Sequence, residues 1–104
     1  MKHLDMFGKE IKIGDYILYA GMRGNSADMK VGKVISLQIR TSERNYNQCP
    51  TITVIGIRKG YQGNWYRNSR KGIIDRLDNV FVVHEAYVPK KLKELMEGAD
   101  DDNR

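Results

Sequence analysis

The sequence predicts a mainly β domain: a small, five-stranded, partly open barrel followed by a short C-terminal helix. Short runs that alternate apolar and polar residues, or that are β-branched almost throughout, predict the strands, and glycine-rich or polar stretches separate them. With 104 residues the chain is long enough for one domain with one modest core. We assign residues 1–98 to this domain and expect the acidic tail, residues 99–104, to be disordered.

The first predicted hairpin is the centre of the barrel. Its strands cover residues 16–20 and 31–40, and a polar loop over residues 21–29 joins them. A long polar loop over residues 41–50 leads to the third strand, residues 51–58, which is β-branched at nearly every position. Gly56 interrupts this strand and indicates either a bulge or a close approach of other atoms to the backbone.

The second half of the chain predicts shorter elements. Residues 59–72 form a basic loop with a short strand at 65–67, a further strand begins or ends at 73–74, and a strand at 80–83 follows one helical turn. A helix over residues 89–97 has Pro89 in its first turn and Gly98 just after its end. Its apolar residues (Val88, Leu92, Leu95 and Met96) share one stripe, which either covers an open end of the barrel or forms a surface for self-association.

Several residues of the first hairpin carry a resemblance: Gly14, Asp15 and Ile17, then Gly32, Lys33, Val34 and Ile35. This pattern resembles the KOW-type opening of Src-homology-type small β-barrels. The resemblance implies a KOW-like, SH3-like fold, and proteins of that type often bind RNA, DNA or the transcription and translation machinery. We carry over only the fold opening, at Gly14, Asp15, Gly32 and Val34. In length and layout the chain also resembles small uncharacterised bacteriophage proteins.

Positive charge is concentrated in the middle of the chain. The net charge is +5, although the tail at residues 99–104 contains three acids and one base. Seven bases and one acid, Glu43, lie between residues 38 and 71. This excess favours an anionic partner.

Basic residues alternate with aromatic residues between positions 58 and 71. Lysine and arginine contact phosphates, and aromatic faces stack on bases, so this composition is typical of a nucleic-acid or nucleotide surface. The predicted binding residues are Arg23, Arg40, Arg44, Arg58, Lys59, Tyr61, Trp65, Tyr66, Arg67, Arg70 and Lys71. The alternative for Trp65 is a place in the core, where large aromatic side chains of small domains are commonly needed.

The sequence contains no recognisable catalytic or metal-binding pattern. His3, His84 and the single Cys49 are too widely spaced for a metal-ligand motif. His84 and Glu85 are neighbours at the end of a predicted strand and therefore point to opposite faces. We expect a non-enzymatic protein without cofactor or metal. One cysteine, together with the absence of a long apolar run, predicts a cytoplasmic protein that does not bind membranes.

Two functions remain open from the sequence. The first is a protein that binds RNA or DNA through its basic and aromatic face. The alternative is a phage accessory or anti-defence protein that sequesters a small anionic nucleotide signal, or that binds and inhibits an acidic host protein. The sequestering version is expected to form a homo-oligomer, with the C-terminal helix as the contact.

Overall fold

The computed structural model describes residues 2–23, 26–41, 47–60, 62–68 and 70–97, and for residues 21–23 and 26–28 it describes the backbone alone. The described chain is mainly β, as predicted, and ends in one short α-helix. The strands are β1 (Tyr16–Arg23), β2 (Ser26–Thr41), β3 (Gln48–Lys59), β4 (Trp65–Arg67), β5 (Gly72–Ile74) and β6 (Val80–Val83). Two short 3-10 helices, η1 (Leu77–Asn79) and η2 (Glu85–Tyr87), precede α1 (Lys90–Glu97).

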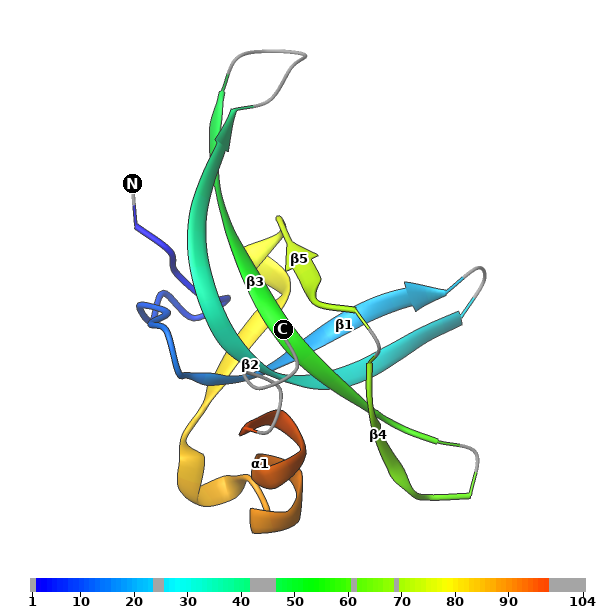
Figure 1. The fold of residues 1–104 in the computed structure, drawn as a ribbon. Coiled ribbons are helices and arrows are strands. Elements are labelled where there is room, and N and C mark those ends of the chain that lie inside the picture. The colour runs from blue at the N-terminus through cyan, green and yellow to red at the C-terminus, as the bar shows by residue number, and fades with distance from the viewer. Residues whose placement is uncertain (1, 24–25, 42–46, 61, 69, 98–104) are drawn as a thin grey trace.

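The strands of the described residues form one six-stranded antiparallel sheet that is bent but not closed into a barrel (Figure 1). The strand order is β4-β3-β2-β1-β6, and β5 also pairs with β3. The predicted number of five strands is wrong, because β3 is long enough to pair with two short strands. Residues 57–59 of β3 pair with β4, and residues 52–54 pair with β5.

The hairpins are longer than predicted. Pairing between β1 and β2 continues to Arg23 and Ser26, so most of the loop predicted at residues 21–29 is strand. Pairing between β2 and β3 likewise continues to Thr41 and Gln48. Once the register of a hairpin is set, backbone hydrogen bonds extend it whatever the polarity of the side chains. The hairpins therefore project as arms from the body of the protein (Figure 1).

One face of the sheet, here called the core side, carries the larger apolar cluster. Its buried residues are Ile11, Ile17, Tyr19, Val34, Ile52, Val54, Leu77, Val80 and Val82, and Leu37 and Ile74 pack against them. A register shift between Val34 and Ser36 inserts one extra residue into β2. Because side chains alternate along a strand, this bulge returns Leu37 to the core side and turns Ser36 away from it.

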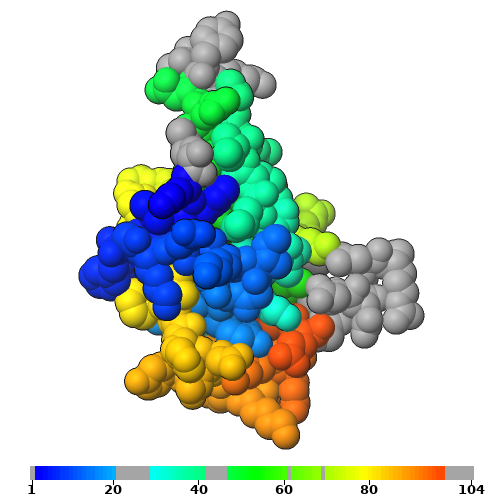
Figure 2. Space-filling model, turned by 90° about the vertical axis from the view of Figure 1, so that its left-hand side faces the viewer, coloured from blue at the N-terminus to red at the C-terminus, as the bar shows by residue number. Residues whose placement is uncertain are grey.

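The N-terminal segment, residues 2–11, lies across the molecule between β2 and β6 (Figure 2). The amide of Met6 donates to the carbonyl of Val80, so the segment covers the outer edge of β6. On the other side, Nε2 of His3 lies 2.7 Å from the carbonyl oxygen of Gln38 in β2. Ile11 at the end of the segment is buried in the larger cluster. The segment thus joins the two sides of the bent sheet without adding a strand.

Helix α1 covers the opposite face of the sheet, here called the helix side. It packs against β3 and β4. Its buried residues Leu92 and Met96, with Val88 before it, contact Tyr16 and Ile57, and Trp65 packs against this second cluster. The predicted helix is confirmed, and its apolar stripe is used within the chain to bury one face of the sheet.

Candidate functional site

Two glycines paired across β2 and β3, Gly32 and Gly56, form a flat part of the core side. The ring of Tyr19 lies over them. A Cβ at Gly32 would be 3.0 Å from Cε1 of Tyr19, and a Cβ at Gly56 would collide with the Tyr19 hydroxyl and lie 2.9 Å from Nδ2 of Asn68. The close approach predicted for Gly56 is confirmed. Burial raises the pKa of Tyr19, so its hydroxyl stays protonated at neutral pH.

Next to this glycine pair, four side chains from four strands lie on the core side as two cross-strand pairs. Tyr19 pairs with Lys30, and Arg58 pairs with Tyr66. The Val31–Ile57 pair is the last of the β2–β3 register. Lys30 and Arg58 each lie one residue beyond this last pair, so alternation along the strands places both on the other face from Val31 and Ile57. Tyr19, Lys30, Arg58 and Tyr66 are called the cross-strand row below.

The exposed end of the cross-strand row is an aromatic ring held in place by a turn. Tyr66 is 51% exposed. Its ring lies so close to Gly60 that a Cβ there would collide with it. The backbone of Gly60 is fixed in turn, because its amide donates to the carbonyl of Asn64 and its carbonyl accepts from the amide of Gly63. The ring of Tyr66 is therefore held beside Arg58, so ordering it on binding costs little conformational entropy.

Other predicted binding residues lie on the helix side. Lys59 pairs with Trp65, and Arg67 pairs with Ile57, so their side chains share the face that α1 covers. Trp65 is half-buried against the α1 cluster. The core alternative considered for Trp65 therefore describes its surroundings better than an open stacking surface. Lys30 in β2 lies on the core side with Arg58.

The remaining predicted residues are spread over the molecule. Arg40 is exposed near the end of β2, paired with Cys49 in the β2–β3 arm. Arg70 and Lys71 are exposed just before or at the start of β5. Of Arg23 only the backbone, in β1, is described, and Arg44 and Tyr61 lie outside the described residues. The predicted binding residues that the structure describes thus lie on both faces of the sheet and in the β2–β3 arm.

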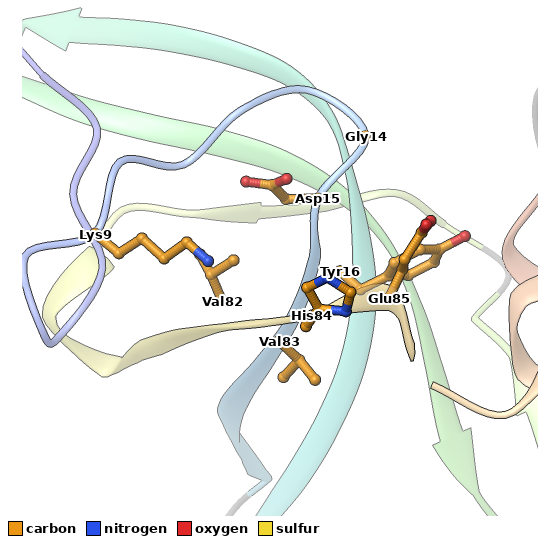
Figure 3. A pocket seen from close by; sticks show the side chains of 8 residues that line it. All are labelled: Lys9, Gly14, Asp15, Tyr16, Val82, Val83, His84 and Glu85. Carbon is orange, nitrogen blue, oxygen red and sulfur yellow. The ribbon is translucent and has the colours of Figure 1, made fainter. Parts of the chain in front are cut away.

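A pocket of about 230 Å³ lies away from these residues, where the N-terminal segment meets β1, β6 and η2. Figure 3 shows Lys9 entering from one side, His84 and Glu85 on the other, and Asp15 between them. Two of these polar groups already support local structure. Oδ2 of Asp15 accepts from the amide of Lys12, and Nδ1 of His84 accepts from the amide of Ala86 at the start of η2. Their positions are explained by the turns they stabilise.

Within the ranges that the structure describes, no group of three or more His, Cys, Asp and Glu side chains is placed to hold a metal ion. No helix in the same ranges has the length and apolar character needed to cross a bilayer.

Residues 3–47 match the family model described as Domain of unknown function (DUF7205). The matched stretch, less than half of the chain, begins at His3, includes β1 and β2, and ends just before β3. Within this stretch, Nε2 of His3 lies 2.7 Å from the carbonyl oxygen of Gln38. No curated protein and no solved structure matches the chain. The family description names no activity.

Proposed function

We propose that the protein is a non-enzymatic nucleic-acid-binding protein and that the cross-strand row is its contact surface. One observation carries the proposal: strand pairing and alternation place Lys30, Arg58 and Tyr66, from three strands, on the core side of the sheet. Cations that share one face of a sheet repel, and an anionic partner relieves that repulsion. The net charge of +5 agrees with such a partner.

Each member of the row has a distinct role in this proposal. Lys30 and Arg58 contact phosphate oxygens, which supplies affinity that depends little on sequence. Tyr66 stacks on an unpaired base, and the Gly60 contact holds its ring ready for that base. Stacking requires an accessible base face, so the favoured partner is single-stranded RNA or DNA.

We propose further that the fold is an open relative of KOW-like, SH3-like small barrels. Support comes from the positions on which that resemblance rests. Gly14 adopts φ +97°, and its amide donates to the carbonyl of Val34, while the amide of Val34 donates to the carbonyl of Asp15. The turn before β1 is therefore joined to Val34, in the middle of β2, by two backbone hydrogen bonds.

Fluorescence anisotropy with an end-labelled single-stranded oligonucleotide tests the binding function. We expect binding that weakens steeply with salt, and loss of most of the affinity in Tyr66→Ala combined with Arg58→Ala. Tyr87→Ala combined with Lys90→Ala is the matched control, since both residues are exposed and far from the row in sequence. Absence of binding at low salt, or equal losses in both variants, would contradict the proposal.

The same titration addresses the nucleotide alternative. Mononucleotides, dinucleotides and cyclic nucleotides are titrated in place of the oligonucleotide. A tight one-to-one complex with one of them, and none with the oligonucleotide, would replace nucleic-acid binding by sequestration of a small anion.

A further inference from the structure

Arg58 lies on the core side between two glycines, Gly56 and Gly60, whose missing side chains leave room for other groups. Successive residues on one face of a strand are about 7 Å apart, so each glycine is one such step from Arg58. At Gly60 the room is taken by the ring of Tyr66, because a Cβ there would collide with that ring. On this side, therefore, the cation has an aromatic neighbour.

Two polar side chains converge over Gly56, on the other side of Arg58. A Cβ at Gly56 would collide with the hydroxyl of Tyr19 and lie 2.9 Å from Nδ2 of Asn68. The backbone places Asn68 there, because its amide donates to the carbonyl of Gly56, 2.8 Å away, and so continues the β3–β4 pairing past Arg67. The cation thus has a ring on one side and neutral hydrogen-bonding groups on the other.

The two polar side chains differ in their access to a partner. Tyr19 is 8% exposed, and its ring lies on the glycine pair. Asn68 is only half-buried. An amide group carries both a donor and an acceptor, so an amide that uses one of them within the protein keeps the other for a ligand. Asn68 is therefore the group that a partner can reach, and Tyr19 acts on it as a positioning residue.

The order of these groups matches the order of groups along a nucleic-acid strand. When a base stacks on Tyr66 and a phosphate lies at Arg58, the sugar of the next nucleotide lies over Gly56, where Asn68 is. The 2′-hydroxyl of ribose is both a donor and an acceptor, and it is the group that distinguishes RNA from DNA at a given site. A half-buried amide gains a hydrogen bond from this hydroxyl that deoxyribose cannot supply.

We propose that the core-side site prefers RNA to DNA, and that Asn68, positioned by Tyr19, determines this preference by hydrogen bonding to a ribose 2′-hydroxyl. This preference rests on the proposed function, which leaves the choice between the two nucleic acids open. Neither side chain contributes a charge. The preference therefore adds to the phosphate contacts without sharing their dependence on salt.

Fluorescence anisotropy with two end-labelled single strands of one sequence, an RNA and a DNA with uracil in both, tests the preference. We expect the wild type to bind the RNA about threefold to tenfold more tightly, which is the usual effect of a neutral hydrogen bond. This ratio should persist as salt lowers both affinities, because the phosphate contacts are the same for both strands. A 2′-O-methyl RNA keeps the sugar conformation of RNA without the hydroxyl donor and should bind like the DNA.

Three variants assign the preference to its residues. Asn68→Ala should lower the RNA affinity to that of the DNA and leave the DNA affinity unchanged, which also shows that the variant folds. Tyr19→Phe should reduce the ratio between the two affinities in the same direction, because it removes the hydroxyl beside the Asn68 amide. Asn79→Ala is the matched control, since Asn79 is an exposed asparagine in η1, and it should keep the wild-type ratio.

The outcomes separate this preference from the proposed function. Equal binding of RNA and DNA by the wild type, or an equal loss for both strands in Asn68→Ala, would overturn the preference and leave the proposed function in place. Binding of the 2′-O-methyl RNA as tightly as the RNA would also overturn it, since the preference would then follow the sugar conformation. If neither strand binds at low salt, the proposed function fails and the preference fails with it.

Discussion

The carboxylate of Asp5 accepts a hydrogen bond from the backbone amide of Val82, 3.0 Å away and 77 residues further along the chain. Its other oxygen, Oδ1, accepts from the amides of Phe7 and Lys9, at 2.9 and 2.8 Å. One buried side chain thereby folds the N-terminal turn and satisfies an edge donor of β6. The contact takes the place of the neighbouring strand that β6 lacks on that side.

Replacing Asp5 should therefore destabilise the whole fold. In Asp5→Asn the side-chain oxygen can accept hydrogen bonds on one side only. On the other side the side-chain NH₂ group would face a backbone N–H, with which it cannot form a hydrogen bond. We expect a loss of about 2–3 kcal/mol, the usual cost of leaving buried donors unpaired. Urea denaturation measures it, with Asp75→Asn, an exposed carboxylate, as the control. A variant as stable as the control would show that the three hydrogen bonds contribute little.

The same carboxylate predicts acid sensitivity. Burial acts to raise the pKa of Asp5, but hydrogen bonds from the amides of Val82, Lys9 and Phe7 outweigh it, and the pKa lies below its ordinary value. The stabilisation is therefore complete above the unfolded-state pKa of about 4, and it is lost as pH falls through the lower folded-state value. Unfolding free energies measured from neutral pH downwards should decline less steeply in Asp5→Asn than in the wild type.

The contact between Tyr19 and Gly56 predicts a measurable coupling. Gly56→Ala forces the new methyl group against the Tyr19 hydroxyl and should cost about 1–3 kcal/mol. Tyr19→Phe removes that oxygen, so the double variant should recover about 1 kcal/mol relative to the sum of the single variants. Thermal or urea unfolding of the four proteins gives the value.

Gly72 in β5, which pairs with β3, serves as the control for this cycle. A Cβ at Gly72 would meet only Cγ2 of Val54, at an ordinary distance of 3.7 Å. Gly72→Ala should therefore be tolerated and should not respond to Tyr19→Phe. Equal destabilisation at Gly56 and Gly72 would show that backbone freedom, and not the tyrosine, requires glycine there.

Tyr16 predicts a loss of stability in alkali. Burial raises the pKa of its hydroxyl, and the charges of Glu97 and Glu85, with the hydrogen bond to Glu97, raise it further. The stabilisation is present below the unfolded-state pKa of about 10 and is lost as pH rises through the higher folded-state value. In Tyr16→Phe the unfolding free energy should fall less steeply above about pH 10. Tyr87→Phe, at an exposed tyrosine, should behave like the wild type.

Strand positions were predictable because alternation and β-branching act locally. The strands near residues 16–20, 51–58, 65–67 and 80–83 and the helix ending at Glu97 were all expected, and all are present. The arm residues were missed because their pairing follows from register and not from their own polarity. The role of Asp5 was missed because its partner, Val82, is remote in sequence.

The faces on which the predicted binding residues lie could be predicted from the sequence only in part. Adjacent strand residues point to opposite faces, so Arg58 and Lys59, or Tyr66 and Arg67, cannot share a surface. This rule follows from the sequence alone once residues 65–67 are predicted as a strand. That Lys30 and Arg58 lie on the same face depends on the register of β2 against β3, which no local pattern specifies.

The division of cations between two faces gives the last prediction. Lys30→Ala with Arg58→Ala removes both cations of the cross-strand row, and Lys90→Ala with Lys91→Ala removes the same charge at the start of α1. For the first pair, the slope of log affinity against log salt should flatten by about 1.4, since each phosphate contact on a single strand contributes about 0.7. The second pair should keep the wild-type slope, because exposed charges outside the contact surface are screened. Equal slopes in the two variants would mean that nucleic acid responds to net charge and not to the row.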